Sequence, residues 1–406
     1  MTRTVSAWVT SGDEFLGSAG PFAVDVPWWS EMGPVVGWLE EQLGVPVLVL
    51  RLLDVEGGAR GRDGHVTYHV EALERPASGL LDQRPVEPRV LDGAEALRSP
   101  WARAEGLREL LDWAAGELAS AGRPVSGPVV QRRTWNLAGL FRLPTARGPV
   151  WLKTTPHFAA DEAAVIAAFA GVDPGLVPPV LGVGERRVLM EHIPGEDCWG
   201  AAPETVGAAV ERFVGAQAAV ASGGSGGCGG FVAGARDWRA PVLEVAVRDL
   251  LDGPLAEELT EPEVRGAREL AGRWELLSEC GLPDTLVHGD FHPGNWRSDG
   301  GAPVVMDFAD AYWGNPVLDG LRVQGFLPES GRAAAARDWV AAWKSRVPGS
   351  DPARALDLAE PLAHLTYAVR YQEFLDGIEP SERPYHRGDP ADEVRAALRC
   401  AGLGLG

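Results

Sequence analysis

The sequence is poor in lysine and in cysteine. Of its 37 basic residues, only Lys153 and Lys344 are lysine, so each of these two positions is informative. The cysteines lie far apart and show no C-x-x-C spacing, which argues against paired cysteines and predicts reduced thiols in a cytoplasmic protein. They are Cys198, Cys228, Cys280 and Cys400.

The sequence also lacks clustered positive charge and long apolar runs. Its formal net charge is −20, which argues against binding to nucleic acid or to an anionic membrane, because both need clustered lysine and arginine. No basic start leads into an apolar run, and no apolar stretch approaches the length of a membrane span. We therefore expect a cytoplasmic protein with neither partner. The charge suits a cationic organic substrate, although an acidic proteome would give the same value.

One stretch, from Leu286 to Phe308, carries a spaced set of oxygen-bearing side chains. It reads LVHGDFHPGNWRSDGGAPVVMDF and predicts two short strands joined by a glycine-rich turn, with Asp290, Asn295 and Asp307 at the strand ends. Transfer of a phosphoryl group from a nucleotide needs such groups. One carboxylate accepts the proton of the attacking hydroxyl, while an amide and a second carboxylate hold Mg²⁺ on the phosphates. The alternative is an ordinary turn, because Asp, Asn, Gly and Pro are common in turns.

The same stretch resembles a known family. HGDFHPGN, followed twelve residues after Asn295 by Asp307-Phe308, is similar to the catalytic and metal-binding loops of the aminoglycoside phosphotransferase and choline kinase-like family. The resemblance covers roughly residues 125–400. It implies an α+β, protein-kinase-like bilobal fold with a small β-rich N-lobe and a larger helical C-lobe. It also implies that Asp290 is the catalytic base, that Asn295 and Asp307 bind Mg²⁺, and that His288 is a structural residue of the loop.

The resemblance assigns two further residues to a nucleotide site. Lys153 lies near the end of an apolar strand, Val150–Thr154. In kinases, a lysine at such a position pairs with the α- and β-phosphates, and a carboxylate on the next helix orients it. The next helical pattern covers Ala159–Ala170, in which Glu162 suits this role better than Asp161. An exposed lysine at a strand end is the alternative.

Two segments of the same lobe would also contact the nucleotide. The turn that covers the phosphates, Thr134–Gly139, has one glycine instead of the G-x-G-x-x-G of protein kinases, which leaves the choice between ATP and GTP open. Val188–Gly195 resembles the hinge whose backbone binds the purine, with Glu191 and Ile193 as the expected contributors. A core strand that ends in a Pro-Gly turn would have the same side chains.

Before the kinase-like part we expect a small additional α+β domain. This domain covers residues 1–124 and begins with strand and helix patterns. Its later part contains a proline-rich linker at Pro76–Pro100 and then another helix. A nucleotide-binding N-lobe then covers residues 125–194. A helical C-lobe covers residues 195–406 and contains a glycine-rich surface loop at Ser222–Gly230. The residues of the additional domain do not indicate its role.

Candidates for the acceptor site follow the metal-binding aspartate and recur late in the chain. They are Asp310, Tyr312, Trp313, Glu373 and Asp376. The first three could face the acceptor, while Glu373 and Asp376 would suit an amine or sugar hydroxyls. A solvated helix end would explain these two charges as well. Asp319, nearby, either braces the catalytic loop, as a matching carboxylate of the family does, or caps its own helix.

The sequence therefore predicts a phosphotransferase. With Mg²⁺ it would move the γ-phosphoryl group of ATP or GTP to a hydroxyl of a small molecule such as an aminoglycoside, an amino sugar or a related natural product. Two alternatives stay open. One is a Ser/Thr kinase that acts on a peptide or protein, although no activation segment ending in Ala-Pro-Glu is present. The other is a catalytically silent, kinase-like module that binds a ligand. The sequence does not identify the acceptor or the oligomeric state.

Overall fold

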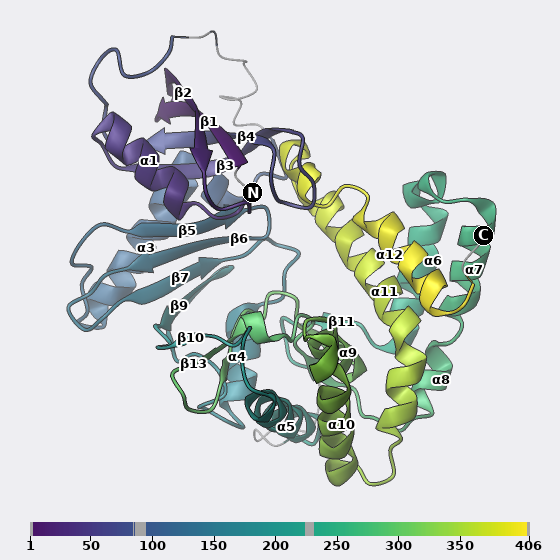
Figure 1. The fold of residues 1–406 in the computed structure, drawn as a ribbon. Helices are drawn as coiled ribbons and strands as arrows, with labels where there is room; N and C mark the ends of the chain where they lie inside the picture. Colours follow the sequence, from purple (N-terminus) through teal and green to yellow (C-terminus); the bar gives the residue numbers. More distant parts are fainter. Residues whose placement is uncertain (1–2, 84, 86–94, 224–230, 404–406) are drawn as a thin grey trace. The chain divides into compact units, whose positions relative to one another are not determined.

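The computed structural model describes residues 3–83, 85, 95–223 and 231–403 (Figure 1). These residues form two units. The first comprises residues 1–158, 181–192 and 374–387, and the second comprises residues 159–180, 193–373 and 388–406. Residues 84 and 86–94 of the predicted linker and residues 224–230 of the predicted surface loop lie outside the described residues. The predicted domain boundaries at 124/125 and 194/195 remain predictions.

The first unit begins with a four-stranded sheet that shares a core with one helix. The strand order is β2-β1-β4-β3, with β1 parallel to β4 and the other neighbours antiparallel. Helix α1 buries Val35, Leu39 and Leu43 in this core and ends at Gly44, whose φ of 68° suits glycine. The elements are β1 (Arg3–Ser11), β2 (Glu14–Val24), α1 (Gly33–Leu43), β3 (Val47–Glu56) and β4 (His65–Ala72).

A five-stranded sheet, in the order β5-β6-β7-β9-β8, follows in the same unit. Leu48 and Leu50 of β3 lie in one hydrophobic core with Leu107 of helix α3 and Phe141 of β6. The predicted additional domain and the predicted nucleotide-binding sheet therefore share a core. The elements are η1 (Pro100–Ala102), α3 (Ala104–Ser120), β5 (Val130–Trp135), β6 (Ala138–Leu143), β7 (Val150–Thr154), β8 (Val180–Gly184) and β9 (Arg187–Glu191).

A buried amide also joins the two sheets. Gln131 on β5 is 1% exposed. Its Oε1 accepts a hydrogen bond from the Val49 N–H at 2.8 Å, and its Nε2 donates to the Val49 carbonyl at 2.7 Å. The pairing of β3 with β4 shifts register between Val49 and Arg51. Because β3 is the edge strand of its sheet, the Val49 N–H and carbonyl can face away from β4, and the glutamine satisfies both groups.

A late segment of the chain, residues 374–387, completes the first unit. It contains the 3₁₀ helix η4 (Pro380–Tyr385). Just before η4, Glu379 accepts hydrogen bonds from Arg51 at 3.2 Å and from Arg98 at 3.0 Å. All three side chains are less than a tenth exposed. A buried carboxylate flanked by two guanidinium groups therefore connects the start of the chain with its last part.

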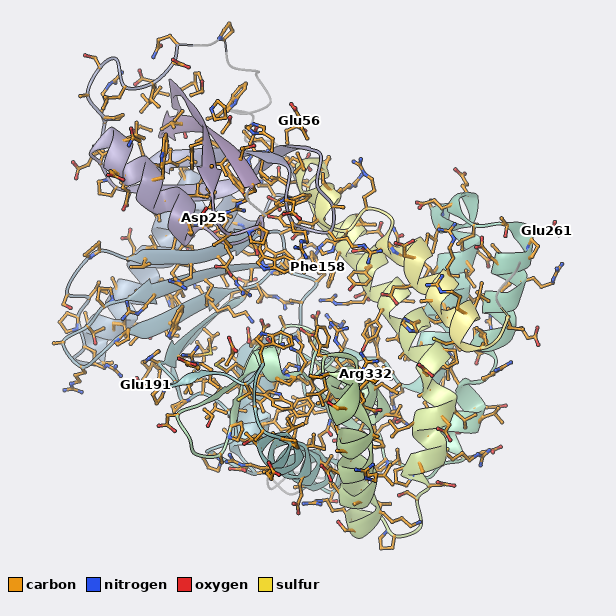
Figure 2. All side chains as sticks on the ribbon, viewed as in Figure 1. Asp25, Glu56, Phe158, Glu191, Glu261 and Arg332 are labelled. Atoms are coloured by element: carbon orange, nitrogen blue, oxygen red, sulfur yellow. The ribbon has the colours of Figure 1, made fainter. Side chains whose placement is uncertain are left out.

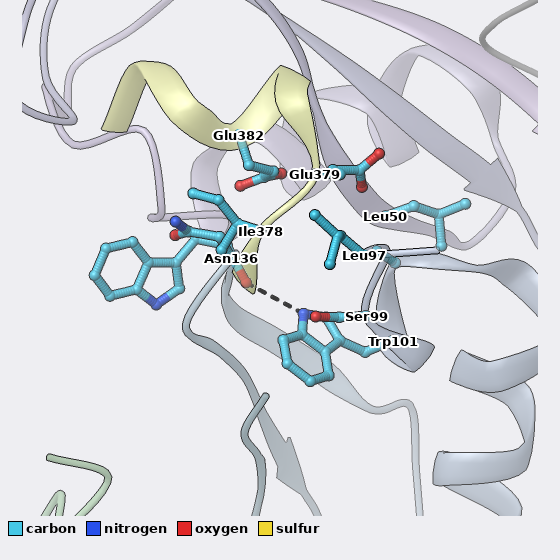
Figure 3. A pocket seen from close by; sticks show the side chains of 10 residues that line it. Leu50, Leu97, Ser99, Trp101, Asn136, Ile378, Glu379 and Glu382 are labelled. Atoms are coloured by element: carbon cyan, nitrogen blue, oxygen red, sulfur yellow. Dashed lines mark hydrogen bonds between the residues drawn. The ribbon is translucent and has the colours of Figure 1, made fainter. Parts of the chain in front are cut away.

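A second carboxylate of this segment, Glu382, is buried beside a small pocket (Figure 3). It accepts hydrogen bonds from the Leu52 N–H at 2.8 Å and from the Asn136 N–H. Burial, together with the nearby negative charge of Glu379, raises the pKa of Glu382 from its ordinary 4.5 to about 8. The side chain is therefore mainly protonated at neutral pH.

We expect Glu382→Gln to remove a pH dependence of stability. The unfolded chain releases the Glu382 proton near pH 4.5, whereas the folded protein keeps it up to about pH 8. The free energy of unfolding therefore falls as the pH rises through this window, and glutamine has no proton to lose. Measured by urea unfolding, the variant should gain on the order of 1–3 kcal/mol over the parent between about pH 5 and about pH 8. A difference independent of pH would contradict this assignment.

The second unit is mainly helical and contains two small sheets, with strand orders β10-β13-β14 and β11-β15-β12. Helix α10 packs against both α9 and α5. None of the helices in the described part of the chain combines the length and the apolar character that a bilayer crossing needs.

The elements of the second unit follow in chain order. The strands are β10 (Glu196–Asp197), β11 (Arg236–Asp237), β12 (Thr285–Val287), β13 (Trp296–Ser298), β14 (Val304–Val305) and β15 (Tyr312–Gly314). The helices are α4 (Glu162–Ala170), α5 (Pro203–Ala221), α6 (Ala240–Asp252), η2 (Pro254–Glu258), α7 (Glu261–Ala271), α8 (Trp274–Ser278), η3 (Pro293–Asn295), α9 (Val317–Gly325), α10 (Glu329–Arg346), α11 (Pro352–Gly377) and α12 (Asp389–Cys400). The last residues of α11, from Phe374, belong to the first unit.

Candidate active site

The loop that follows β12 is held by a buried carboxylate. Asp319 on α9 is 1% exposed, and its two oxygens accept hydrogen bonds from the N–H groups of His288 at 2.9 Å and Gly289 at 3.0 Å. The Gln217 side chain donates a third hydrogen bond at 2.9 Å. The N-cap residue of α9 is Pro316. The structure therefore confirms that Asp319 braces the loop and excludes the alternative that it caps the helix.

His288 is a buried histidine that connects two segments of the loop. Burial lowers the pKa of its imidazole, which favours the neutral form. Nδ1 accepts a hydrogen bond from the Asp290 N–H at 3.1 Å, so Nε2 carries the proton and donates to the Met306 carbonyl at 2.9 Å. The ring thus links the Asp290 backbone to the residue before Asp307, as expected for a structural residue.

The glycine between His288 and Asp290 is required by the conformation of the loop. Gly289 has a φ of 83°, and a Cβ atom at this position would lie 2.4 Å from the Asp310 carbonyl oxygen. A side chain would therefore be strained and would also push Asp310 away from the loop. The close approach brings the segment after Asp307 against the residue that precedes Asp290.

The Asp290 carboxylate is surrounded by nitrogen atoms. Asn295 Nδ2 lies 3.0 Å from its Oδ2 and 3.0 Å from the Asp290 carbonyl oxygen, and His292 Nε2 lies 3.3 Å from Oδ2. Arg322 approaches Oδ1 with both Nε and Nη2 at 2.7 Å. Burial alone would raise the pKa of Asp290, but Arg322 and His292 outweigh it and hold that pKa well below its ordinary value. The carboxylate is therefore ionised at neutral pH.

Asn295 and Asp307 offer oxygen atoms of the kind that Mg²⁺ prefers. Asn295 Nδ2 donates the hydrogen bonds to Asp290. The Asn295 side-chain oxygen takes no part in those two hydrogen bonds. Asp307 is exposed and has a φ of 67°, a strained conformation typical of functional sites. The Met306 N–H donates to the Asn295 carbonyl at 2.8 Å, which connects the two ligand positions. These residues fit the ion.

The fit agrees with how Mg²⁺ is usually bound. The described residues contain no group of three or more His, Cys, Asp or Glu side chains placed to hold a metal. Mg²⁺ in nucleotide sites needs no such cage, because one or two protein oxygens are completed by waters and by the phosphates of the nucleotide. Asn295 and Asp307 as its ligands remain a prediction.

The predicted nucleotide residues Lys153 and Glu162 lie in different units. Lys153 is 6% exposed and sits on β7, between Leu140 of β6 and Val188 of β9. It is therefore not the exposed lysine of the alternative interpretation. Glu162, the first residue of α4, is 4% exposed, and its Oε1 accepts a hydrogen bond from the Phe308 N–H at 3.0 Å. The interaction of Lys153 with Glu162 remains a prediction.

The predicted hinge residues also belong to different units. Glu191 ends β9 and is labelled in Figure 2, and its carboxylate forms an ion pair with Arg123. The Ile193 carbonyl accepts a hydrogen bond from Arg297 Nε at 3.1 Å. A purine that bonded to this carbonyl would share it with Arg297. The two backbone contacts to a nucleotide remain predictions.

The charged candidates for the acceptor site have basic neighbours. Arg370 bonds to Asp310 through Nε and Nη2, both at 2.8 Å, and to Glu373 through Nη1 at 2.8 Å. Arg236 lies 3.9 Å from the same Asp310 oxygen. Asp376 is exposed and belongs to the first unit, whereas the other candidates belong to the second. Asp310 and Glu373 are thus largely neutralised within their own unit.

The aromatic candidates are core residues. Tyr312 and Trp313 on β15 are 2% and 6% exposed. The Tyr312 ring packs against Trp238 with 5.0 Å between ring centroids, and both residues line a cavity that also includes Trp274. Because Tyr312 and Trp313 are buried in the sheet, the structure does not support direct contact between them and an acceptor. That contact remains an untested prediction.

Sequence reasoning missed two side chains that contact Asp290. His292 lies inside the H-G-D-F-H-P-G-N motif, which was the available signal, and its ring stacks on Phe326 with 4.2 Å between centroids. Arg322 follows Asp319 by three residues on α9. Residues at that spacing share a helix face, so the position of Asp319 was the signal that could have identified Arg322.

Comparison with known proteins decides the family. The chain matches the model of the phosphotransferase enzyme family, APH, over residues 120–356, which is more than half of its length. The chain belongs to this family. As a phosphotransferase of the APH family, it has its HGD loop, Asn295 and Asp307 within the matched region, whereas residues 1–119 precede it. A search of curated protein sequences found no match.

Solved structures with the same fold include a choline/ethanolamine kinase family protein and a choline kinase. A choline/ethanolamine kinase family protein from Mesorhizobium loti is 17% identical, with a TM-score of 0.50 over 73% of this phosphotransferase and 100% of that chain. The choline kinase LicA from Streptococcus pneumoniae is 10% identical, with a TM-score of 0.53 over 72% and 99% of the two chains. At these identities the likeness shows the fold alone. The α+β, protein-kinase-like fold predicted from the sequence is confirmed.

Proposed function

We propose that this phosphotransferase moves the γ-phosphoryl group of ATP or GTP to a hydroxyl group of a small molecule, with Mg²⁺. The observation that carries the proposal is the state of Asp290. Its carboxylate is ionised, its loop is fixed through Asp319, and its direct neighbour is the amide of Asn295. An ionised carboxylate on a fixed loop can act as the base for an attacking hydroxyl once one of its oxygens is accessible to that hydroxyl. The choline kinases with the same fold are the reason for placing a small-molecule acceptor first.

Each residue then has a defined task. Asp290 accepts the hydroxyl proton as the oxygen attacks the γ-phosphorus in line with the leaving diphosphate. Asn295 and Asp307 would hold Mg²⁺, which supplies positive charge against the phosphates when it is bound. Lys153, oriented by Glu162, offsets charge on the α- and β-phosphates. Glu191 and Ile193 contribute backbone groups to the purine.

We expect Lys153→Met to weaken productive nucleotide binding. Methionine keeps most of the buried stem of the side chain but removes the ammonium group, so the sheet is preserved and the phosphates lose a partner. The expected result is a fall of about 10²-fold or more in kcat/KM for the nucleotide. It is measured as nucleoside diphosphate release with varied Mg-ATP or Mg-GTP.

The chain offers a matched control for this variant. Its other lysine, Lys344, is exposed on α10 and donates to the Ser350 carbonyl at 2.6 Å. Lys344→Ala should leave nucleotide kinetics unchanged. Equal effects of the two substitutions, or none from Lys153→Met, would remove Lys153 from the nucleotide site.

A panel assay tests the reaction itself. Purified protein with Mg-ATP or Mg-GTP is offered aminoglycosides, amino sugars, sugars, hydroxy amines and hydroxy acids. We expect diphosphate release together with one product that is heavier by a single phosphoryl group. Neither nucleotide binding nor turnover would overturn the proposal and favour a silent ligand-binding module. A phosphorylated peptide in place of a small-molecule product would favour a peptide kinase.

A further inference from the structure

Arg322 occupies one oxygen of the proposed catalytic carboxylate. Its Nε and Nη2 both lie 2.7 Å from Asp290 Oδ1, while His292 and Asn295 engage Oδ2. A hydroxyl can lose its proton to Asp290 only if one of these oxygens is accessible to it. Among the described residues, Arg322 is the one side chain that forms hydrogen bonds to Oδ1, so movement of Arg322 would free this oxygen from its hydrogen-bonded partner. Something must therefore replace Asp290 as the partner of this guanidinium.

The guanidinium of Arg322 is held by aromatic rings. Its central carbon lies 4.5 Å from the ring centroid of Phe326 and 5.0 Å from that of Tyr367. Contacts with ring faces orient the planar group and leave its N–H edges directed at an anion. The Arg322 side chain is 25% exposed, so a solute can reach it. The group is both oriented in advance and accessible.

Two carboxylates of the same unit are already paired with a guanidinium group. Asp310, which abuts Gly289, bonds to Arg370 through two nitrogens, and Glu373 bonds to the same arginine. An amine that paired with Asp310 or Glu373 would have to compete with Arg370 for it. The unit charges of Asp290, Asp310 and Glu373 are balanced by Arg322, Arg370 and Arg236.

We propose that the acceptor carries an oxyanion, a carboxylate or a phosphate, close to its reacting hydroxyl, and that Arg322 binds this group. The inference rests on the proposed function and names its substrate class. Two oxygens of a carboxylate or of a phosphate match the fork of a guanidinium, which can bond to them through two parallel N–H groups. When Arg322 turns to the oxyanion, Asp290 Oδ1 becomes available to the hydroxyl.

The reaction then follows with all atoms assigned. The acceptor oxygen forms a bond to the γ-phosphorus, and the bond from that phosphorus to the β,γ-bridging oxygen breaks. The bridging oxygen leaves on the nucleoside diphosphate with the bonding electron pair, and the hydroxyl proton passes to Asp290 and later to solvent. A cationic acceptor would instead expose Arg322 to a like charge and give it no new partner. An anionic acceptor gives Arg322 a new anionic partner in place of the Asp290 carboxylate.

Three small alcohols of similar size and different charge test the proposal. Glycolate is anionic, glycolamide is neutral and ethanolamine is cationic, and each has one primary hydroxyl. Binding to the full chain is measured by calorimetric titration, without nucleotide, for the parent, Arg322→Gln, Arg322→Lys and a control. The control is Arg248→Gln, since Arg248 is an exposed residue of α6 that pairs with Glu244 on the same helix. Glycerol 3-phosphate provides the arm that distinguishes phosphate from carboxylate.

We expect the parent to bind glycolate or glycerol 3-phosphate about 10- to 100-fold more tightly than glycolamide or ethanolamine. Arg322→Gln should remove this preference, Arg322→Lys should retain part of it, and Arg248→Gln should change nothing. Circular dichroism confirms that each variant is folded. The proposal would be overturned if the parent preferred ethanolamine or bound neither oxyanion. It would also be overturned if Arg322→Gln kept the preference of the parent. Since no nucleotide is present, these outcomes are separate from a failure of phosphoryl transfer.

Discussion

Asp290→Asn is expected to lower kcat for phosphoryl transfer by about 10²- to 10⁴-fold, because it removes the group that takes the hydroxyl proton. The substitution keeps the size of the side chain and an oxygen that can still accept from Arg322, Asn295 or His292. Lys153 and Asp307 are untouched, so nucleotide affinity should stay within about twofold of the parent. Single-turnover assays with product detection by mass separate the chemical step from nucleotide binding.

Two comparisons make this result specific. Asp252→Ala, at an exposed carboxylate of α6 that pairs with Arg268, should leave both constants unchanged. A thermal shift on addition of Mg-ATP should be the same for Asp290→Asn and the parent. Full-rate turnover by purified Asp290→Asn would exclude Asp290 as the base. Loss of the nucleotide-dependent shift would instead indicate that the variant disturbs the phosphate site.

Asp319→Ala is expected to damage both the catalytic loop and the activity. It leaves the buried N–H groups of His288 and Gly289 without their acceptor, at a cost of about 1–3 kcal/mol each. The Asp290 backbone follows directly, so the carboxylate shifts from its position. A misplacement of about 1 Å costs on the order of 10²-fold in rate. Hydrogen exchange of a peptide spanning residues 285–295 should show lost protection, alongside the lower kcat.

Asp319→Asn provides a graded comparison. Burial raises the pKa of the Asp319 carboxyl to about 7, despite three hydrogen bonds that favour its charge. An uncharged amide avoids part of this desolvation cost but turns a donor toward one of the N–H groups. Its loss of protection should therefore lie between that of the parent and that of Asp319→Ala. Protection and kcat that are unchanged in both variants would show that Asp319 does not brace the loop.

The conformation of the loop around Asp290 could be predicted because it depends on residues that are close in the sequence. Asp290, Asn295 and Asp307 stand in one short stretch, where strand ends and glycines fix their mutual arrangement within narrow limits. The strand that carries Lys153 was equally accessible, since an apolar run with a turn on each side has few alternatives. In both cases the residues that interact are also near one another in the sequence.

Contacts between distant segments had no comparable signal. Arg322 is 32 residues from Asp290, and Glu379 is 328 residues from Arg51. No local periodicity specifies which turn of a helix meets which loop. The expectation that Glu373 would suit an amine relied on its charge alone. The structure pairs it with Arg370, three residues earlier on the same helix, and this neutralises the charge.

The bond between Glu379 and Arg51 also sets an order of events during synthesis. At roughly 5–20 residues per second, a ribosome takes about 16 to 66 s to add the 328 residues that separate them. Throughout that time Arg51 lacks the carboxylate of Glu379. The Arg51 side chain can therefore reach its final set of partners only after residue 379 has been added.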